Sequence, residues 1–413
     1  MNIAVIGLGF VGLTTGLGLA EKGFNVRGYD INKERCADIA GGKVPFFEPG
    51  LGEALSRNLG KTFTVTGNAI DTANDCDICF FCVGTPALPN GGADLTHLLA
   101  AMDSVISTVS QDCVFVVKST VPPGTLKERV APYIRAKGMK HPMASNPEFL
   151  REGHCWDDFM NADRIVCGIS DDIARDILTK IYAPFNAPVH FVEPSTAEFI
   201  KYLSNSLLAT LISYSNEMSL IADAVGDINI AKAFRILHED KRLAGAGINS
   251  YIYPGCGFGG YCLPKDTAAL NSTALSKGLP SRILQGVLTL NDEMPGLTAK
   301  KIARAASSKS ENIGILGLSF KPGSDDVRDS SAAKIIAALI GDGYKNIYAY
   351  DPLANQEFAD WYGFPIQYSA TAKAVCETCS TVAVVTAWND FAEIDKAFPS
   401  VRFVDCRYFL GEE

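Results

Sequence analysis

The chain has 413 residues, a formal net charge of −9 and 47% hydrophobic residues. This length is too great for one hydrophobic core and predicts two or three domains. The acidic charge balance excludes a broad nucleic-acid surface, and no apolar run approaches the roughly eighteen residues that a membrane helix needs. We therefore expect a cytoplasmic protein that binds small anionic ligands, and neither nucleic acid nor membrane.

The beginning of the chain has the pattern of a dinucleotide-binding unit. An apolar run is followed by the turn Gly7-Leu8-Gly9-Phe10-Val11-Gly12, and a helical period continues to Glu21. The next predicted strand ends in Asp30, where an acid can bond both ribose hydroxyls of an adenosine. Its negative charge favours NAD over NADP, although the cations Lys33 and Arg35 would suit a 2′-phosphate.

Short apolar runs alternate with helical periods through the first half of the chain, which predicts a parallel sheet flanked by helices. Two predicted strands end in loops with hydroxyl groups, Val83-Gly84-Thr85-Pro86 and Lys118-Ser119-Thr120-Val121-Pro122. Ligands of doubly wound folds bind at this carboxyl edge of the sheet. We therefore expect Thr85 and Thr120 at the cofactor site.

The twelve cysteines, with no secretion signal visible, indicate free thiols in a reducing compartment. Two clusters have the spacing of metal ligands. They are Cys76, Cys79 and Cys82, and Cys376 with Cys379. Both lie in or beside apolar strands, whose side chains point to alternate faces and make poor tetrahedral cages. We expect core cysteines and no metal site.

A long helix is predicted to begin at Pro194-Ser195-Thr196-Ala197-Glu198, with a capping box from Ser195 to Glu198. Apolar positions keep the helical period as far as Gly226. A helix of about thirty residues exceeds the needs of one domain, so we interpret it as a spine that joins domains and subunits. The alternative is two shorter helices with a kink near residues 213–216.

The last third of the chain repeats the layout of the first. A predicted strand at 313–318 leads through a polar loop with Lys321 and Arg328 into a helix, and the following strand ends at Asp351. The loop lacks the glycine pattern, so it should hold a different nucleotide-like ligand through side chains such as Lys321. We predict an α/β fold with two Rossmann-like doubly wound domains, joined by a long central helix and a helical region. The expected domain bounds are 1–194, 195–300 and 301–413.

One segment places a thiol beside charged groups: Gly257-Phe258-Gly259-Gly260-Tyr261-Cys262-Leu263-Pro264-Lys265-Asp266. Glycines allow close approach of backbone to a ligand, and Pro264 is suited to the first residue of a helix. A thiol at a positive helix end beside an ammonium is activated as a nucleophile. The alternative is a buried structural cysteine in a glycine-rich turn.

Together with Asn146-Pro147-Glu148-Phe149-Leu150-Arg151-Glu152-Gly153 and with Lys201 and Asn205, this segment resembles the UDP-glucose/GDP-mannose dehydrogenase family, over essentially the whole chain. The resemblance implies a homodimer around a central helix, an N-terminal NAD domain and a C-terminal domain for a UDP-sugar. It also implies oxidation of C6 of a nucleotide-linked hexose to a carboxylate with two NAD in succession. Tyr261 and Leu263-Pro264-Lys265-Asp266 resemble the UDP-glucose and GDP-mannose branches more than the branch that oxidises N-acetylated sugars. Between these nucleotides we expect UDP-glucose, which gives UDP-glucuronate, with GDP-mannose or another nucleotide sugar as the alternative.

The resemblance implies a role for each catalytic group. Cys262 captures the aldehyde as a thiohemiacetal that becomes a thioester. Lys201 and Asn205 stabilise the oxyanions, while Glu148, with Thr120 and Asp266, activates the water that hydrolyses the thioester. Glu152 is the alternative base.

Two further sets of residues are carried over from the family. The NAD set is Gly7, Gly9, Phe10, Val11, Gly12, Asp30, Lys33, Arg35, Thr85, Thr120, Glu152, Lys265 and Arg328. The sugar-nucleotide set is Glu148, Phe149, Leu150, Arg151, Glu152, Lys201, Asn205, Arg242, Tyr251, Tyr253, Gly257, Phe258, Gly259, Cys262, Lys321 and Arg407. In such dimers Arg242 reaches into the site of the neighbouring subunit.

Two other functions remain open from the sequence. One is a two-electron NAD-dependent hydroxy-acid dehydrogenase in which Cys262 is structural and a helix lysine acts as acid or base. The other is an NAD-binding scaffold without catalysis, which would leave Glu148, Lys201 and Cys262 without a purpose.

Overall fold

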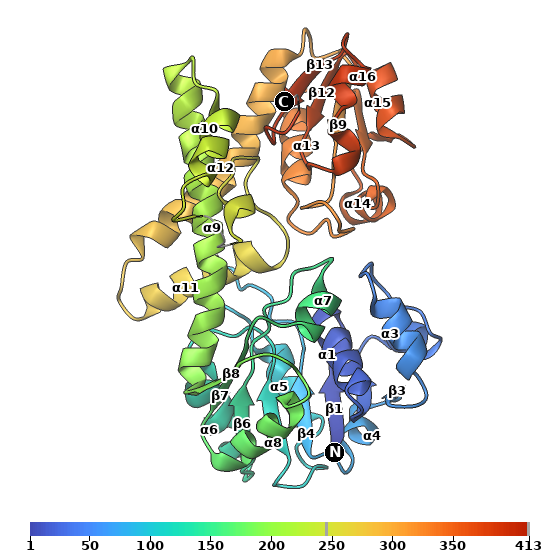
Figure 1. Ribbon diagram of the computed structural model, residues 1–413, viewed down its shortest axis with the longest axis vertical. Helices are drawn as coiled ribbons and strands as arrows, with labels where there is room; N and C mark the ends of the chain where they lie inside the picture. The colour runs from blue at the N-terminus through green and yellow to red at the C-terminus, as the bar shows by residue number, and fades with distance from the viewer. Residues whose placement is uncertain (244–246, 411–413) are drawn as a thin grey trace. The chain divides into compact units, whose positions relative to one another are not determined.

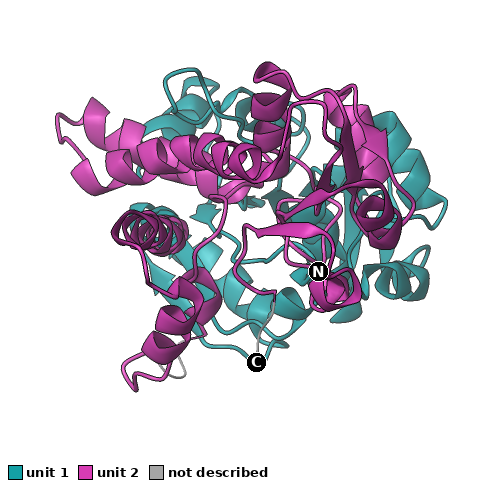
Figure 2. Ribbon diagram, turned by 90° about the horizontal axis from the view of Figure 1, so that it is seen from above, with its two compact units in different colours: residues 1–204 teal, residues 205–413 magenta. Residues whose placement is uncertain are grey.

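The computed structural model describes residues 1–243 and 247–410. The chain forms two compact units, residues 1–204 and 205–413, which Figure 2 shows in different colours. The division into three domains at residues 194 and 300 stays a prediction. No helix among the described residues is both long and apolar enough to cross a membrane.

Unit 1 is built on an eight-stranded sheet with the order β3-β2-β1-β4-β5-β6-β7-β8 (Figure 1). Its pairs are parallel except for β6 with β7. The strands are β1 (Asn2–Ile6), β2 (Asn25–Tyr29), β3 (Phe63–Val65), β4 (Ile78–Phe81), β5 (Val114–Val117), β6 (Met143–Ser145), β7 (Ile165–Ile169) and β8 (Val189–Val192). The chain reverses direction across the sheet between β1 and β4, the switch point where doubly wound folds bind ligands.

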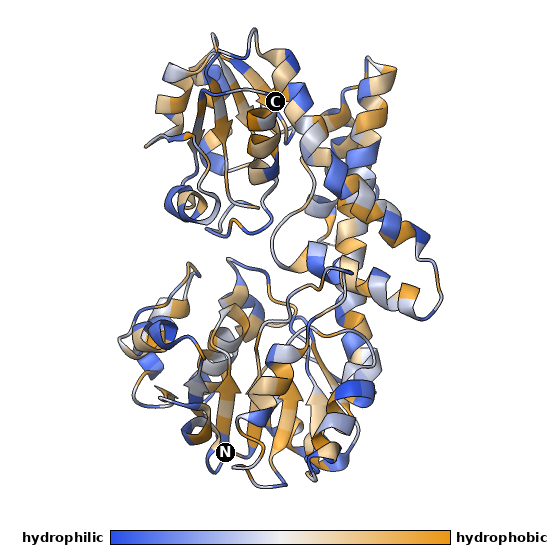
Figure 3. Ribbon diagram, turned by 180° about the vertical axis from the view of Figure 1, so that it is seen from behind, coloured by the Kyte–Doolittle hydropathy of each residue, from blue (hydrophilic) through white to orange (hydrophobic). Residues whose placement is uncertain are grey.

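The helices of unit 1 cover both faces of this sheet. They are α1 (Phe10–Glu21), α2 (Lys33–Ala40), α3 (Leu51–Asn58), α4 (Ala69–Ala73), α5 (Thr96–Asp103), the π-helical turn η1 (Leu126–Val130), α6 (Ala131–Ala136), α7 (Cys155–Met160) and α8 (Asp172–Tyr182). Along β1, Ile3 and Val5 belong to one apolar core, whereas Ala4 and Ile6 belong to the other. Because both faces are buried, the central strands β4 and β5 consist entirely of apolar residues. The hydropathy colours of Figure 3 show apolar residues along the sheet.

Helix α9 (Pro194–Val225) is one continuous helix of 32 residues, as expected from its apolar period. The expected capping box is wrong. The Glu198 carboxylate instead accepts hydrogen bonds from the backbone amides of Gly124, at 2.6 Å, and Leu126, at 2.9 Å. Glu198 therefore fastens α9 to the loop that follows β5.

Unit 2 begins within α9 and continues through a helical region to a second sheet. The helices of that region are α10 (Ile230–His238), the short η2 (Asn249–Tyr251), α11 (Cys262–Ser276) and α12 (Arg282–Ala305). The sheet has five parallel strands in the order β11-β10-β9-β12-β13. This is again the order of a Rossmann-like half, so the predicted fold class is confirmed.

The second sheet also carries helices on both faces. Its strands are β9 (Ile313–Leu316), β10 (Ile347–Tyr350), β11 (Gln367–Tyr368), β12 (Thr381–Val384) and β13 (Arg402–Asp405). Its helices are α13 (Ser331–Gly341), α14 (Asn355–Tyr362), α15 (Ala372–Thr378), the short η3 (Asn389–Phe391) and α16 (Ile394–Ala397). Ile313 and Ile315 enter one apolar core and Leu316 the other, so β9 is the central, fully buried strand.

Candidate functional site

The glycine turn after β1 has the shape that a pyrophosphate needs. A Cβ atom on Gly12 would lie 1.7 Å from the carbonyl oxygen of Gly7, and Gly7 has a φ of +93°. A Cβ atom on Gly9 would meet nothing within 4 Å. Gly9 is also the residue before the first turn of α1, where backbone amides and the helix dipole favour an anion. This turn therefore fits the phosphates of a dinucleotide.

Asp30 joins the end of β2 to the glycine turn. Its Oδ2 accepts a hydrogen bond from the Leu8 amide at 2.7 Å, and its Oδ1 accepts one from the Asn32 amide at 2.9 Å. Arg35 Nη1 lies 3.1 Å from Asp30 Oδ2, so this cation is paired with the acid. Lys33 is the exposed first residue of α2, and Phe10 stacks on Phe46 at the start of α1.

Ile31 is a residue that sequence reasoning missed. Its side chain is 87% exposed and directly follows Asp30. An exposed apolar side chain beside Asp30, the acid predicted to bind a ribose, offers a flat contact for a nucleotide base. The available signal was a lone isoleucine between two polar residues after a strand.

Hydrogen bonds from hydroxyl groups connect the loops that follow β4 and β5. Thr85 Oγ1 donates to the carbonyl oxygen of Thr120 at 2.8 Å, and Ser119 Oγ donates to that of Val83 at 2.6 Å. Thr85 is buried and Thr120 is half-buried. The structure therefore brings the two predicted threonines together at the carboxyl edge of the unit 1 sheet.

Glu148 and Lys201 form a buried ion pair within unit 1. Glu148 Oε1 lies 3.1 Å from Lys201 Nζ, and both side chains are less than a tenth exposed. Glu148 also accepts a hydrogen bond from the Leu150 amide. Lys201 Nζ lies 5.6 Å and the guanidinium of Arg164 4.3 Å from the centre of the Phe149 ring. The loop after β6 is thus held to α9.

The other predicted residues of this loop are placed differently. The Arg151 guanidinium pairs with Asp158, with 2.6 Å between Nη2 and Oδ1. Leu150 packs against the apolar core, and Glu152 is half-buried in the turn that precedes α7. Of the two candidate bases, Glu148 is the more buried and contacts Lys201.

Lys118 is a second buried lysine that sequence reasoning named only as part of a loop. Its Nζ donates to Asn146 Oδ1 at 3.0 Å and to the Asn146 carbonyl oxygen at 3.3 Å. Burial lowers the pKa of Lys118, while the nearby Cys82 and Glu148 act to raise it. Lys118 therefore anchors the start of the loop that carries Glu148.

Cys262 stands apart from the other cysteines. It is the single exposed thiol of the twelve, whereas nine are buried and two are half-buried. Burial raises the pKa of Cys82, Cys167 and Cys379 to about 12. Cys262 is also the first residue of α11, two residues before the helix start expected at Pro264. Its thiol therefore lies in the first turn, at the positive helix end.

Three polar side chains form a chain beside the first turn of α11. Asn205 Nδ2 donates to Asp266 Oδ2 at 2.6 Å, and Lys265 Nζ donates to Asp266 Oδ1 at 2.5 Å. All three are buried. Lys265 Nζ lies 5.4 Å and the Arg328 guanidinium 4.8 Å from the centre of the Tyr261 ring. Within unit 2 the structure therefore brings together Asn205, Asp266, Lys265 and Arg328 around the segment that carries Cys262.

The remaining candidates of unit 2 lie on neighbouring loops. A Cβ atom on Gly255 would lie 2.4 Å from Arg407 Nη1, and Tyr253 Oη donates to the Tyr408 carbonyl oxygen at 2.8 Å. Lys321 Nζ lies 5.5 Å from the centre of the Phe320 ring. Tyr251 ends η2. Arg242 lies on the surface of unit 2, paired with Asp240, and its side chain is 88% exposed.

Asp351 resembles Asp30 in sequence and also accepts a bond from the turn after the first strand of its sheet, but it has additional donors. Its Oδ2 accepts bonds from the Leu318 amide, from the amide and hydroxyl of Ser319, and from Trp388 Nε1. Its Oδ1 accepts bonds from the Leu353 and Ala354 amides. The carboxylate is 2% exposed. Asp351 therefore holds the loops at the end of the second sheet instead of facing a ribose.

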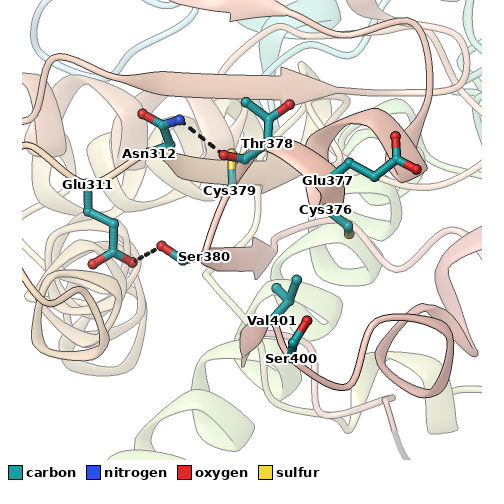
Figure 4. Close-up of a pocket in the computed structure, with 9 residues that line it drawn as sticks. All are labelled: Glu311, Asn312, Cys376, Glu377, Thr378, Cys379, Ser380, Ser400 and Val401. Atoms are coloured by element: carbon teal, nitrogen blue, oxygen red, sulfur yellow. Dashed lines mark hydrogen bonds between the residues drawn. The ribbon is translucent and has the colours of Figure 1, made fainter.

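The second cysteine cluster lines a surface pocket near the start of β12 (Figure 4). Cys376 and Cys379 are buried there, beside Glu311 and Ser380. In the part of the chain that the structure describes, no group of three or more histidine, cysteine, aspartate or glutamate residues could hold a metal ion. None of the predicted site residues lines this pocket.

Comparison with known proteins matches nearly the whole chain to one family. Residues 1–186 match the model of the UDP-glucose/GDP-mannose dehydrogenase family, NAD binding domain. Residues 195–293 match the central domain of that family, and residues 314–412 match its UDP binding domain.

Individual relatives agree with these matches. A UDP-glucose 6-dehydrogenase of Rickettsia bellii is 36% identical over 404 residues, which cover 96% of this chain and 91% of the relative. The structure of a UDP-glucose dehydrogenase from Pyrobaculum islandicum is 35% identical, with a TM-score of 0.91 and coverage of 99% and 94%. A UDP-D-ManNAc dehydrogenase structure from Pyrococcus horikoshii is 25% identical, with a TM-score of 0.88 and coverage of 100% and 97%.

Proposed function

The chain belongs to the UDP-glucose/GDP-mannose dehydrogenase family, and on that premise we propose that it oxidises UDP-glucose to UDP-glucuronate. It is an NAD-dependent nucleotide-sugar 6-dehydrogenase. The choice of glucose is supported by the relatives that are 35–36% identical, whose names specify UDP-glucose. The dehydrogenase named for UDP-D-ManNAc is 25% identical.

One observation carries the chemistry of the proposal. Among twelve cysteines, only Cys262 is exposed, and it lies at the positive end of α11. Its thiolate adds to the aldehyde carbon of C6 and gives the alkoxide of a thiohemiacetal, which expels a second hydride and becomes a thioester. NAD, when bound at the glycine turn and Asp30, accepts one hydride in each oxidation. A structural cysteine, as a two-electron hydroxy-acid dehydrogenase would have here, would not need this exposure.

Two side chains of α9 stabilise negative charge on the oxygen at C6. Lys201 and Asn205 are four residues apart on one helix, and therefore point to the same side of it. An ammonium and an amide that are already held in place can each contribute about 3 to 4 kcal/mol to an oxyanion. Glu148 and Asp266 hold these two donors, at 3.1 Å and 2.6 Å.

Hydrolysis of the thioester requires a base for water. Glu148 has this role in the proposal, because it is buried, contacts Lys201 and follows the strand next to that of Thr120. The water adds to the thioester carbon, its proton passes to Glu148, and the Cys262 thiolate leaves. The Cys262 thiol is thereby regenerated.

The proposal includes a homodimer in the cytoplasm. Helix α9 exposes a row of large apolar side chains at helical spacing. They are Phe199, Leu203, Leu207, Tyr214, Ile221 and Val225, each between 44% and 69% exposed. A row of apolar side chains along a helix of this length, interrupted on that side by the exposed Glu217, is suited to a second copy of the same helix. Replacement of Leu207 and Ile221 by Glu should give monomers in light scattering, and an unchanged dimer would contradict this interface.

The substrate is tested with a panel of nucleotide sugars and saturating NAD, followed at 340 nm. UDP-glucose should give a kcat/KM at least about tenfold above GDP-mannose, which corresponds to about 1.4 kcal/mol of transition-state discrimination. A higher value for GDP-mannose would support the alternative substrate. No absorbance change with any member of the panel would support a scaffold protein.

A further inference from the structure

Asn291 of α12 binds both backbone polar groups of one residue in the loop that leads to Cys262. Its Oδ1 accepts a hydrogen bond from the Phe258 amide at 2.7 Å, and its Nδ2 donates to the Phe258 carbonyl oxygen at 3.0 Å. Asn291 is 4% exposed. A buried side-chain amide that satisfies both the NH and the C=O of one residue fixes that residue as a neighbouring strand would.

The loop can approach α12 closely because of two special residues. Gly257 has a φ of +94°, and a Cβ atom there would lie 2.8 Å from Asn291 Oδ1. Pro295, inside α12, has no amide hydrogen for the carbonyl oxygen of Asn291 four residues earlier. That carbonyl oxygen faces Gly257, at 3.5 Å from the same Cβ position. Sequence reasoning missed Asn291 because its partner lies 33 residues away.

The same loop is held at two further points in unit 2. The Gly255 amide donates to Asn216 Oδ1 of α9 at 2.7 Å, and the Gly260 amide donates to the Arg328 carbonyl oxygen at 3.0 Å. Cys262 follows two residues after Gly260. The loop is therefore fixed before, at and after Phe258, and Asn291 supplies the central attachment.

We propose that Asn291 is a positioning residue for Cys262: by holding Phe258, it keeps the start of α11 where the thiol captures the aldehyde before that intermediate leaves. This inference rests on the proposed function, because it requires that Cys262 form the thiohemiacetal. Asn291 itself contacts the loop backbone and acts through Cys262.

The test follows the fate of C6 with UDP-glucose labelled with ¹³C at that carbon. NMR distinguishes the alcohol, the aldehyde hydrate and the carboxylate, while absorbance at 340 nm counts NADH per sugar consumed. The unaltered protein should give two NADH per sugar and label only in the carboxylate. Asn291→Ala should give fewer than two, with the missing oxidation present as aldehyde hydrate, and a kcat lowered about tenfold or more.

This ratio separates positioning from stability, because unfolded molecules consume no sugar and do not change the NADH counted per sugar. Asn271→Ala is the matched control. Asn271 is a buried asparagine of α11 whose side chain bonds Gln285 and Ser281 instead of the loop. The Asn271→Ala variant should have a lower melting temperature than the unaltered protein but should still form two NADH per sugar. Asn291→Asp keeps an acceptor for the Phe258 amide but loses the donor to the Phe258 carbonyl oxygen. Its number of NADH per sugar should therefore lie between that of the unaltered protein and that of Asn291→Ala.

The outcomes are distinguishable from one another. One NADH per sugar from the unaltered protein would overturn the proposed function. Two NADH per sugar from both the unaltered protein and Asn291→Ala, with equal kcat, would overturn only the role of Asn291. Aldehyde release from Asn271→Ala would also overturn it, because any loosening of α11 would then suffice. If the Ala variant does not fold, Asn291→Asp decides the question by the same ratio.

Discussion

Lys201 Nζ lies 3.1 Å from Glu148 Oε1, and both side chains are buried. The pair places the proposed base for hydrolysis beside the proposed oxyanion donor. Truncation of Glu148 would remove both its charge and the groups that contact Lys201. Glu148→Gln is more informative, because it removes only the proton-accepting carboxylate and keeps the shape and an oxygen that can accept a hydrogen bond from Lys201.

Glu148→Gln should separate the oxidations from hydrolysis. The amide cannot accept a proton from water, so the thioester should accumulate after two hydride transfers. Stopped-flow absorbance should show a burst of NADH near two per active site, followed by a steady rate lowered about 100-fold or more. Intact mass spectrometry should then find the sugar nucleotide attached to Cys262. A steady rate equal to that of the unaltered protein would assign the base to another residue, and Glu152→Gln is the next variant to measure.

Glu198 should make stability fall as pH rises toward neutrality. Burial raises its pKa to about 7 against the hydrogen bonds of the Gly124 and Leu126 region, which lower it. A carboxyl whose folded pKa lies above its unfolded value contributes stability at low pH, and that contribution is lost as pH rises from about 4.5 to about 7. Glu198→Gln removes this dependence. The stability of the variant relative to the parent should therefore rise between pH 5 and pH 8, by about 3 kcal/mol at most.

Urea unfolding at both pH values measures this difference. A relative stability that is equal at pH 5 and pH 8 would contradict the raised pKa. The conservative amide keeps an acceptor for one loop amide, so the variant should retain the fold.

Glu311 should show the opposite pH dependence. Hydrogen bonds from the Thr381 and Ser380 hydroxyls and the Ser307 amide lower its pKa to about 2. Figure 4 shows the bond between Glu311 and Ser380. A carboxylate with a depressed pKa contributes stability above about pH 4.5 that is lost as pH falls toward 2. Glu311→Gln should therefore be less stable than the parent at pH 7, and the difference should shrink at pH 3. Thermal unfolding at the two pH values measures it, and a difference that grows on acidification would contradict the assignment.

Replacement of Gly12 by alanine should lower the melting temperature, whereas replacement of Gly9 by alanine should weaken NAD binding. At Gly12 the new Cβ would lie 1.7 Å from the Gly7 carbonyl oxygen, so Gly12→Ala should lower the melting temperature without any ligand. At Gly9 the space is open, so Gly9→Ala should melt like the parent but weaken NAD binding, because the methyl group would occupy the approach of the pyrophosphate. Calorimetry gives both quantities. Parent-like NAD affinity of a folded Gly9→Ala would place the phosphates elsewhere.

The sequence was most informative where local patterns carry the information. The glycine turn and the period of α9 depend on residues that are close in the chain, and the structure has both. Asp351 shows the limit of such patterns, since it ends a strand as Asp30 does but is surrounded by donors from three loops.

Hydrogen-bond partners that lie far apart in the chain could not be predicted from the sequence. Glu198 was expected to cap its own helix, but its carboxylate binds amides that lie 72 and 74 residues earlier. Asn291 and Lys118 were missed for the same reason, because nothing in their neighbourhood in the sequence indicates which backbone groups they will meet. Such contacts depend on packing between elements, which period and spacing do not encode.

The most direct test of the account is the number of NADH formed per molecule of UDP-glucose when the sugar nucleotide is limiting. The unaltered protein should form two, and Cys262→Ser should lose the second oxidation. One NADH per sugar from the unaltered protein, or full four-electron turnover by Cys262→Ser, would contradict the thioester route and leave Cys262 without its catalytic role.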